Sequence, residues 1–212
     1  MMRLIFVRLA GLIIALSLLG PFGCLGKGTT QPTRFYHLNP LASSDSMKKV
    51  SAPGTDLAIG VGPIQLPEYL DRPQIVTREG NNELQLAEFS QWAESLTKNF
   101  SRVFAENLSI LLDTERVVIF RWKGTRSLTY WVKMEVSRFD GELGGNASLI
   151  ARWGIYEEDG INAIMTKRAS FTEPVNGKDY ESLVAAQSRL IMAFSREVAE
   201  TIRTLSEGVP GR

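Results

Sequence analysis

The chain has 212 residues, with 24 Lys and Arg against 23 Asp and Glu, a formal net charge of +1 and 44% hydrophobic residues. A near-neutral chain with mixed charges lacks the basic face that neutralises phosphates, so nucleic-acid binding is not expected. Its single cysteine excludes an internal disulfide and a cysteine-based zinc cluster.

The N-terminus has the pattern of an export signal. Arg3 and Arg8 give a basic start, and residues 9–20 (LAGLIIALSLLG) form an apolar run shorter than the roughly 20 residues that span a bilayer as a helix. A Gly-Cys pair ending at Cys24 follows this run. This ending resembles the bacterial lipobox, in which the cysteine is lipidated and becomes the mature N-terminus. The lipobox prefers Leu three residues before the cysteine, where this chain has Pro21.

We therefore predict a lipoprotein signal peptide over residues 1–23 and a lipidated tether over residues 24–33. Cys24 is expected to carry covalent N-acyl (palmitate-type) and S-diacylglycerol lipids, and no other cofactor is expected. Leu25 stands where aspartate would resemble an inner-membrane retention signal, so we expect the periplasmic side of the outer membrane. The alternatives are a soluble secreted protein whose signal happens to contain a cysteine, and an uncleaved anchor. Removing the signal takes away two arginines and no acid, which changes the formal charge from +1 to −1.

The first half of the mature chain predicts short strands and then a helix. Strands are expected at 34–38 and 56–64, and a hairpin at 74–78 and 83–88 around a Glu-Gly-Asn-Asn turn. From Ser90 to Leu111 apolar residues recur at spacings of three and four, which predicts an amphipathic helix. The apolar positions of this stripe are Trp92, Leu96, Phe100, Val103, Phe104, Leu108 and Leu111.

The second half predicts four strands and a second helix. A strand is expected at 116–122, and three alternating strands joined by short turns, hence antiparallel neighbours, at 128–136, 147–155 and 161–171. Asp179 can cap a final helix that ends near Gly208. Together these elements predict one α+β domain over residues 34–208 and a tail over 209–212. Its mostly antiparallel sheet has two long amphipathic helices packed on one face.

The sequence offers no catalytic set, so we predict that the protein is not an enzyme. His37 is the only histidine, and no Gly-x-Ser-x-Gly elbow accompanies it. The three consecutive acids at Glu157, Glu158 and Asp159 lie in a predicted turn and are interpreted as solvated turn residues. Catalytic, cofactor-binding and metal-binding residues are therefore all predicted to be none.

Trp131 falls on the polar register of its strand, out of phase with Tyr130 and Val132. An exposed aromatic side chain on a polar face can mark an interface, where tryptophan is enriched. The alternatives are a strand buried on both faces and a tryptophan that lies flat beneath a loop.

One stretch carries a family resemblance. Residues 57–78 (LAIGVGPIQLPEYLDRPQIVTR), the segment Arg138–Gly141 and the strand Leu149–Trp153 are similar to the auxiliary lipoproteins of intermembrane transport systems, the PqiC- or YmbA-like family. The resemblance extends over nearly the whole mature chain, from Tyr36 to the last helix.

The resemblance implies a non-catalytic part in an MCE-type (phospho)lipid transport system associated with an ABC transporter. There the lipoprotein docks a periplasmic tube of MCE-domain protein at the outer membrane, as a homo-oligomeric ring. The alternative function is that of a monomeric periplasmic lipid- or glycan-binding lipoprotein.

Prolines stiffen the loop over residues 66–73, which we expect to contribute to a subunit or partner contact unless it serves packing alone. The candidate interface residues are Leu66, Pro67, Tyr69, Asp71, Arg72 and Trp131.

Overall fold

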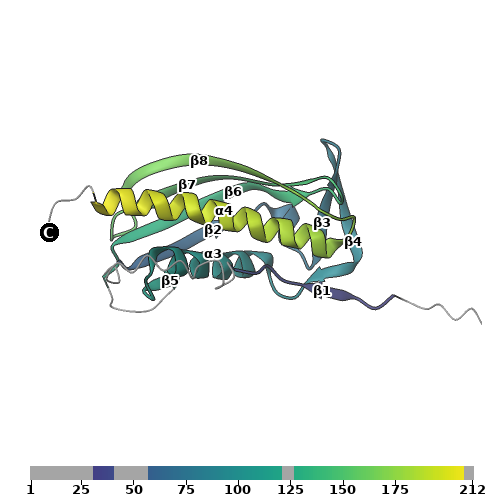
Figure 1. The fold of residues 1–212 in the computed structure, drawn as a ribbon, viewed down its shortest axis with the longest axis horizontal. Helices are drawn as coiled ribbons and strands as arrows, with labels where there is room; N and C mark the ends of the chain where they lie inside the picture. The colour runs from purple at the N-terminus through teal and green to yellow at the C-terminus, as the bar shows by residue number, and fades with distance from the viewer. Residues whose placement is uncertain (1–30, 41–56, 121–126, 208–212) are drawn as a thin grey trace, which may run out of the picture. The chain divides into compact units, whose positions relative to one another are not determined.

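The computed structural model describes residues 31–40, 57–120 and 127–207, and those from Thr33 onward belong to one compact unit (Figure 1). The elements in chain order are β1 (Arg34–Tyr36), β2 (Ile59–Gln65), the 3-10 helix η1 (Glu68–Leu70), β3 (Gln74–Glu79), β4 (Glu83–Trp92), α3 (Leu96–Leu112), β5 (Val117–Ile119), β6 (Tyr130–Gly141), β7 (Asn146–Tyr156), β8 (Ala163–Pro174) and α4 (Tyr180–Glu207). The predicted signal peptide, the lipidation site Cys24, the tail and Gly208 lie outside the described residues.

The strands form a five-stranded sheet, in the order β5-β2-β6-β7-β8, and a three-stranded sheet, in the order β1-β4-β3. The predicted antiparallel neighbours β6, β7 and β8 pair along most of their length. However, β2 runs parallel to both β5 and β6, and β1 runs parallel to β4. The α+β class is therefore confirmed, with mixed sheets instead of purely antiparallel ones.

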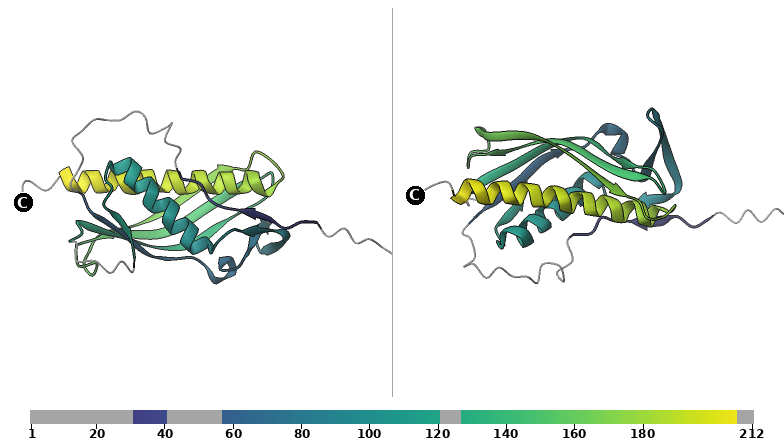
Figure 2. Two further views of the ribbon diagram at one scale, coloured as in Figure 1. Left: turned by 90° about the horizontal axis from the view of Figure 1, so that it is seen from below. Right: turned by 45° about the horizontal axis from the view of Figure 1, so that its top comes forward.

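Both long helices cover the same face of the five-stranded sheet, as predicted (Figure 2). The alternation along β6 shows why, because Val132 and Met134 are buried under the helices whereas Glu135 points to the other side and is exposed. Asp179 caps α4 as predicted, since its Oδ1 accepts a hydrogen bond of 2.8 Å from the backbone N–H of Ser182. None of the helices in the described part of the chain is long and apolar enough to cross a membrane.

Buried aromatic rings fill the layer between the helices and the sheet. Phe100 of α3 meets Phe139 of β6 edge-on at 5.2 Å between ring centroids, and Phe194 of α4 contacts both Phe104 at 5.3 Å and Trp153 at 5.9 Å. Each of these side chains is less than 2% exposed. Full burial of one such side chain contributes about 2–3 kcal/mol, so this layer is the main source of stability.

The predicted start of the first helix at Ser90 is wrong, because α3 begins at Leu96. Residues Ser90–Trp92 instead extend β4, where Tyr36 of β1 is in register with Trp92. The backbone N–H of Trp92 also donates to the carbonyl oxygen of Pro73 at 2.7 Å. Trp92 is buried in a strand, and its spacing from Leu96 matches a helical period only by coincidence.

The face of the five-stranded sheet opposite the helices is called the open face below. Strand alternation places Trp131, Lys133 and Glu135 of β6 on it, paired with Tyr156, Gly154 and Arg152 of β7. Along β6 a β-bulge after Val136 brings Arg138 and Asp140 onto the same face. The Asp140 end of the open face is covered by β3 and η1.

Candidate functional site

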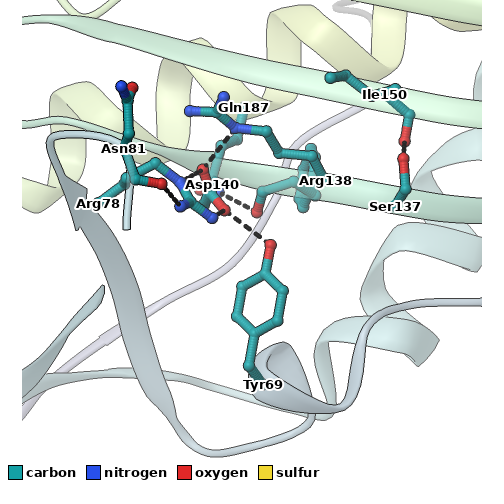
Figure 3. Close-up of polar contacts among 9 residues, drawn as sticks. Tyr69, Arg78, Asn81, Ser137, Arg138, Asp140, Ile150 and Gln187 are labelled. Atoms are coloured by element: carbon teal, nitrogen blue, oxygen red, sulfur yellow. Dashed lines mark hydrogen bonds and ion pairs between the residues drawn. The ribbon is translucent and has the colours of Figure 1, made fainter. Parts of the chain in front are cut away.

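The most elaborate polar arrangement described in the structure surrounds the carboxylate of Asp140, whose side chain is fully buried (Figure 3). Arg78 donates from Nε to Oδ1 at 3.0 Å and from Nη2 to Oδ2 at 2.9 Å. Arg138 donates from Nε to Oδ1 at 2.9 Å, and the phenol of Tyr69 donates to Oδ2 at 2.7 Å. We call these four residues the Asp140 cluster.

The electrostatics of the Asp140 cluster keep the carboxylate ionised. Burial alone would raise the pKa of Asp140, but the hydrogen bonds from Arg78, Tyr69 and Arg138 outweigh it and hold the pKa below its ordinary value. Burial and the bond to Asp140 raise the pKa of Tyr69 to about 12, so the phenol remains a donor at neutral pH. The bond to Asp140 likewise raises the pKa of Arg78.

Three separate elements meet in the Asp140 cluster. Asp140 and Arg138 lie near the end of β6, Arg78 lies near the end of β3, and Tyr69 lies in η1. The guanidinium of Arg78 reaches further and donates to the carbonyl oxygen of Asn81 in the β3–β4 turn at 3.1 Å. The cluster therefore fastens both η1 and the hairpin to the open face of the five-stranded sheet.

The loop of residues 66–73 is anchored by side chains that point into the protein, and only part of its surface is exposed. Leu70 is 3% exposed in the core, and the N–H of Leu70 donates to the carbonyl oxygen of Pro67 at 2.9 Å. Tyr69 points inward to Asp140, whereas Asp71 and the neighbouring Glu68 are exposed.

The other predicted residues of the loop are half-buried. Leu66 packs against the core, and Pro67 precedes η1. Arg72 has a buried Nε without a hydrogen-bond partner among the described residues.

Trp131 lies far from this loop. Trp131 and Asp140 are nine residues apart on β6, which at about 3.3 Å per residue separates them by roughly 30 Å. The indole lies across Gly60, contacts Phe120 edge-on at 6.3 Å between ring centroids, and donates from Nε1 to the carbonyl oxygen of Glu158 at 3.2 Å. The structure therefore divides the predicted interface residues between two ends of the sheet.

The residues weighed for catalysis have ordinary structural surroundings. His37 is exposed, with its Nδ1 3.2 Å from the carbonyl oxygen of Leu38. In the acidic turn, the Asp159 carboxylate accepts hydrogen bonds from the backbone N–H groups of Ile161 and Asn162, at 2.7 and 3.3 Å, as the turn interpretation predicts. No group of three or more His, Cys, Asp and Glu that could hold a metal ion occurs within residues 31–40, 57–120 and 127–207.

The central role of Asp140 and Arg78 is not evident from the sequence. Arg138 and Asp140 are noted there only for the family resemblance. Their spacing of two on a strand carries a usable signal, because it places a guanidinium and a carboxylate on one face. Nothing in the sequence pairs that carboxylate with Arg78, which is 62 residues away.

A family model described as ABC-type transport auxiliary lipoprotein component matches residues 36–199. The chain belongs to this family. No curated protein matches it in sequence. Among solved structures, a protein from Xanthomonas campestris is 15% identical with a TM-score of 0.65 and covers 82% of this chain and 98% of its own. A second crystal structure, of an uncharacterized protein, is 15% identical with a TM-score of 0.66 and covers 81% and 99%. At this identity the two likenesses establish the fold alone.

Proposed function

We propose that this chain is a non-catalytic lipoprotein subunit of an MCE-type intermembrane (phospho)lipid transport system. In this proposal the lipid on Cys24 anchors it to the outer membrane on the periplasmic side. There the protein forms a homo-oligomeric ring that docks the periplasmic MCE tube. Membership in a family of ABC-type transport auxiliary lipoprotein components is the observation that carries the proposal.

The Asp140 cluster supports a structural role. A catalytic acid or base must exchange a proton with a substrate, which requires a reachable carboxyl group. Both oxygens of Asp140 accept from three donor side chains, and the carboxylate is fully buried. Such a carboxylate holds chain segments together and leaves no oxygen free for a substrate proton.

The loop of residues 66–73, which Tyr69 fastens to the sheet, supports a docking role. Because Tyr69 ties η1 to the sheet, the exposed Glu68 and Asp71 project from a backbone that is already ordered. Binding through a pre-ordered surface loses less conformational entropy than binding through a flexible one. We therefore retain this loop as a subunit or partner contact.

Native mass spectrometry of the detergent-extracted lipoprotein, together with co-purification of a co-expressed MCE-domain protein, tests the proposal. A single oligomer of defined stoichiometry that retains the MCE protein is the expected result. A monomer that carries a bound lipid or glycan and no MCE protein would contradict the proposal and support the alternative of a ligand-binding lipoprotein.

A further inference from the structure

The middle of the open face carries a concentration of positive charge. Arg152 of β7 is directly in register with Arg168 of β8, and both side chains are exposed. Neither forms an ion pair with a residue that the structure describes. Like charges directly opposite each other destabilise a sheet, so this pair weakens the isolated domain. Glu135, in register with Arg152 on β6, balances one of the two charges.

Lys133 adds a third positive charge to the open face, two residues before Glu135 on β6. Its ammonium group lies over the ring of Tyr156 at 4.5 Å and donates to the carbonyl oxygen of Gly160. Neither contact neutralises the charge, which is offset in part by the nearby carboxylate of Asp159, whose pKa Lys133 helps to lower. We call Lys133, Arg152 and Arg168 the basic row.

An acidic surface lies at the covered end of the same sheet. Glu68 and Asp71 are exposed on η1 and just after it, and Glu79 and Glu83 are exposed at the hairpin. The Asp140 cluster fixes both of these elements to the sheet, so the carboxylates and the basic row are carried by one ordered body.

We propose that the acidic loop of one copy, through Glu68 and Asp71, docks on the basic row of a second copy. Charge complementarity supports this contact, because the two surfaces have opposite sign. Glu135 balances one charge of the Arg152–Arg168 pair and leaves the other without an ion pair among the described residues, and Glu68 and Asp71 are likewise exposed without one. Complementary potentials of this kind select partners and fix their register. The contact joins two different surfaces, so it is heterologous, the type from which closed rings are built.

This inference rests on the proposed homo-oligomer and names its interface. It also gives the like-charged pair Arg152–Arg168 a role, because two carboxylates from a neighbouring copy would relieve the repulsion. The exposed apolar side chains Phe120 and Ile161, 48% and 78% exposed beside the basic row, are available for contact at its edge.

A charge-swap experiment tests the interface, using the mature lipoprotein in detergent and measuring assembly by light scattering and sedimentation. The double substitution Arg152→Glu with Arg168→Glu should weaken association at least about tenfold, and so should Glu68→Arg with Asp71→Arg. The four substitutions combined should restore association to within about threefold of the wild type. Increasing salt should dissociate the wild type and the combined variant alike.

Lys98→Glu with Arg196→Glu is the matched control, because it changes the net charge by the same amount at exposed positions on the helices. Association of this control should equal that of the wild type. An assembly that both charge reversals leave intact would overturn the inferred interface while the proposed ring stands. Failure of the combined variant to recover would also overturn it. An intact assembly that retains no MCE protein would contradict the proposed function instead.

Discussion

The phenol of Tyr69 donates a hydrogen bond of 2.7 Å to Asp140, although 71 residues separate the two in sequence. Together with the two bonds from Arg78, this contact closes a long loop of chain around a carboxylate that has no exposed surface. Bonds to a buried charge are stronger than those between neutral groups, and leaving such a charge without partners is costly. The Asp140 cluster is therefore where single substitutions should have their largest effect outside the apolar core.

Replacing Asp140 with Asn should lower the free energy of unfolding by about 2–3 kcal/mol, because two guanidinium groups lose their counter-ion. The loss should be smaller than the about 3–5 kcal/mol of a fully buried pair, since Arg78 and Arg138 are 18% and 35% exposed. Chemical denaturation measures it. Glu135→Gln, on the same strand but exposed, should change stability by less than about 0.5 kcal/mol. Equal stability of both variants would contradict the structural role of the cluster.

Acid should destabilise the wild type through the same residue. The pKa of Asp140 in the folded protein lies below its ordinary value of 3.8. Its contribution is therefore complete above about pH 4 and lost as the pH falls through the folded-state pKa. Unfolding free energies at pH 5 and pH 3 should differ more for the wild type than for Asp140→Asn. An identical difference for the two proteins would exclude Asp140 as the source.

High pH should also destabilise the protein, in this case through loss of the Tyr69 proton. Because the folded-state pKa is raised from 10.0 to about 12, the unfolded chain loses this proton more easily. The stabilisation is fully present below pH 10 and is lost as the pH rises toward 12. Melting temperatures measured over this range should fall less steeply for Tyr69→Phe, and parallel curves would argue against the assignment.

Gly60 and Trp131 should be energetically coupled. A Cβ atom at position 60 would lie 2.4 Å from Cε3 of Trp131, and the indole is also held by its bond to the Glu158 carbonyl. Gly60→Ala should therefore cost about 1–3 kcal/mol through overpacking. Combined with Trp131→Leu, the same substitution should cost clearly less, as a double-mutant cycle measures. Additive effects would show that the indole does not restrict position 60.

If the proposed lipidation holds, replacing Cys24 with Ser should move the protein from the membrane to the soluble periplasmic fraction, because the proposed acyl chains on this cysteine are its membrane anchor. Its circular dichroism and melting temperature should match those of the wild type, since the compact unit begins at Thr33. Membrane association that survives the substitution would contradict the anchor. Full transport function of the soluble form would show that the anchor is dispensable.

The α+β class and both helices could be predicted because apolar spacing reports directly on which face of an element is buried. The alternation along residues 147–155 and the cap at Asp179 are local signals, and both hold. Pairing between distant strands leaves no such signal. The parallel contacts of β2 with β5 and β6, and the extension of β4 to meet β1, depend on the tertiary arrangement.

The candidate site was predictable only in part for the same reason. The prolines of residues 66–73 predict an ordered turn, and the structure has η1 there, whereas Tyr69 is predicted as a subunit or partner contact and its phenol points inward instead. Its actual partner, Asp140, lies on a strand more than sixty residues later. A sequence shows that a polar residue is present on a strand, but not which distant side chain will satisfy it.

The position of β2 between two partners from later in the chain has a consequence for biogenesis. Val61 is in register with Ile119 and Val132, so both flanks of this strand are supplied by residues synthesised after it. In the proposed exported lipoprotein the chain would cross the membrane N-terminus first, so β2 would reach the far side about seventy residues before β6, its second partner strand. Until then its apolar side chains and backbone groups remain open to misassembly. We expect periplasmic holding factors to bind the emerging N-terminal half until β6 has crossed.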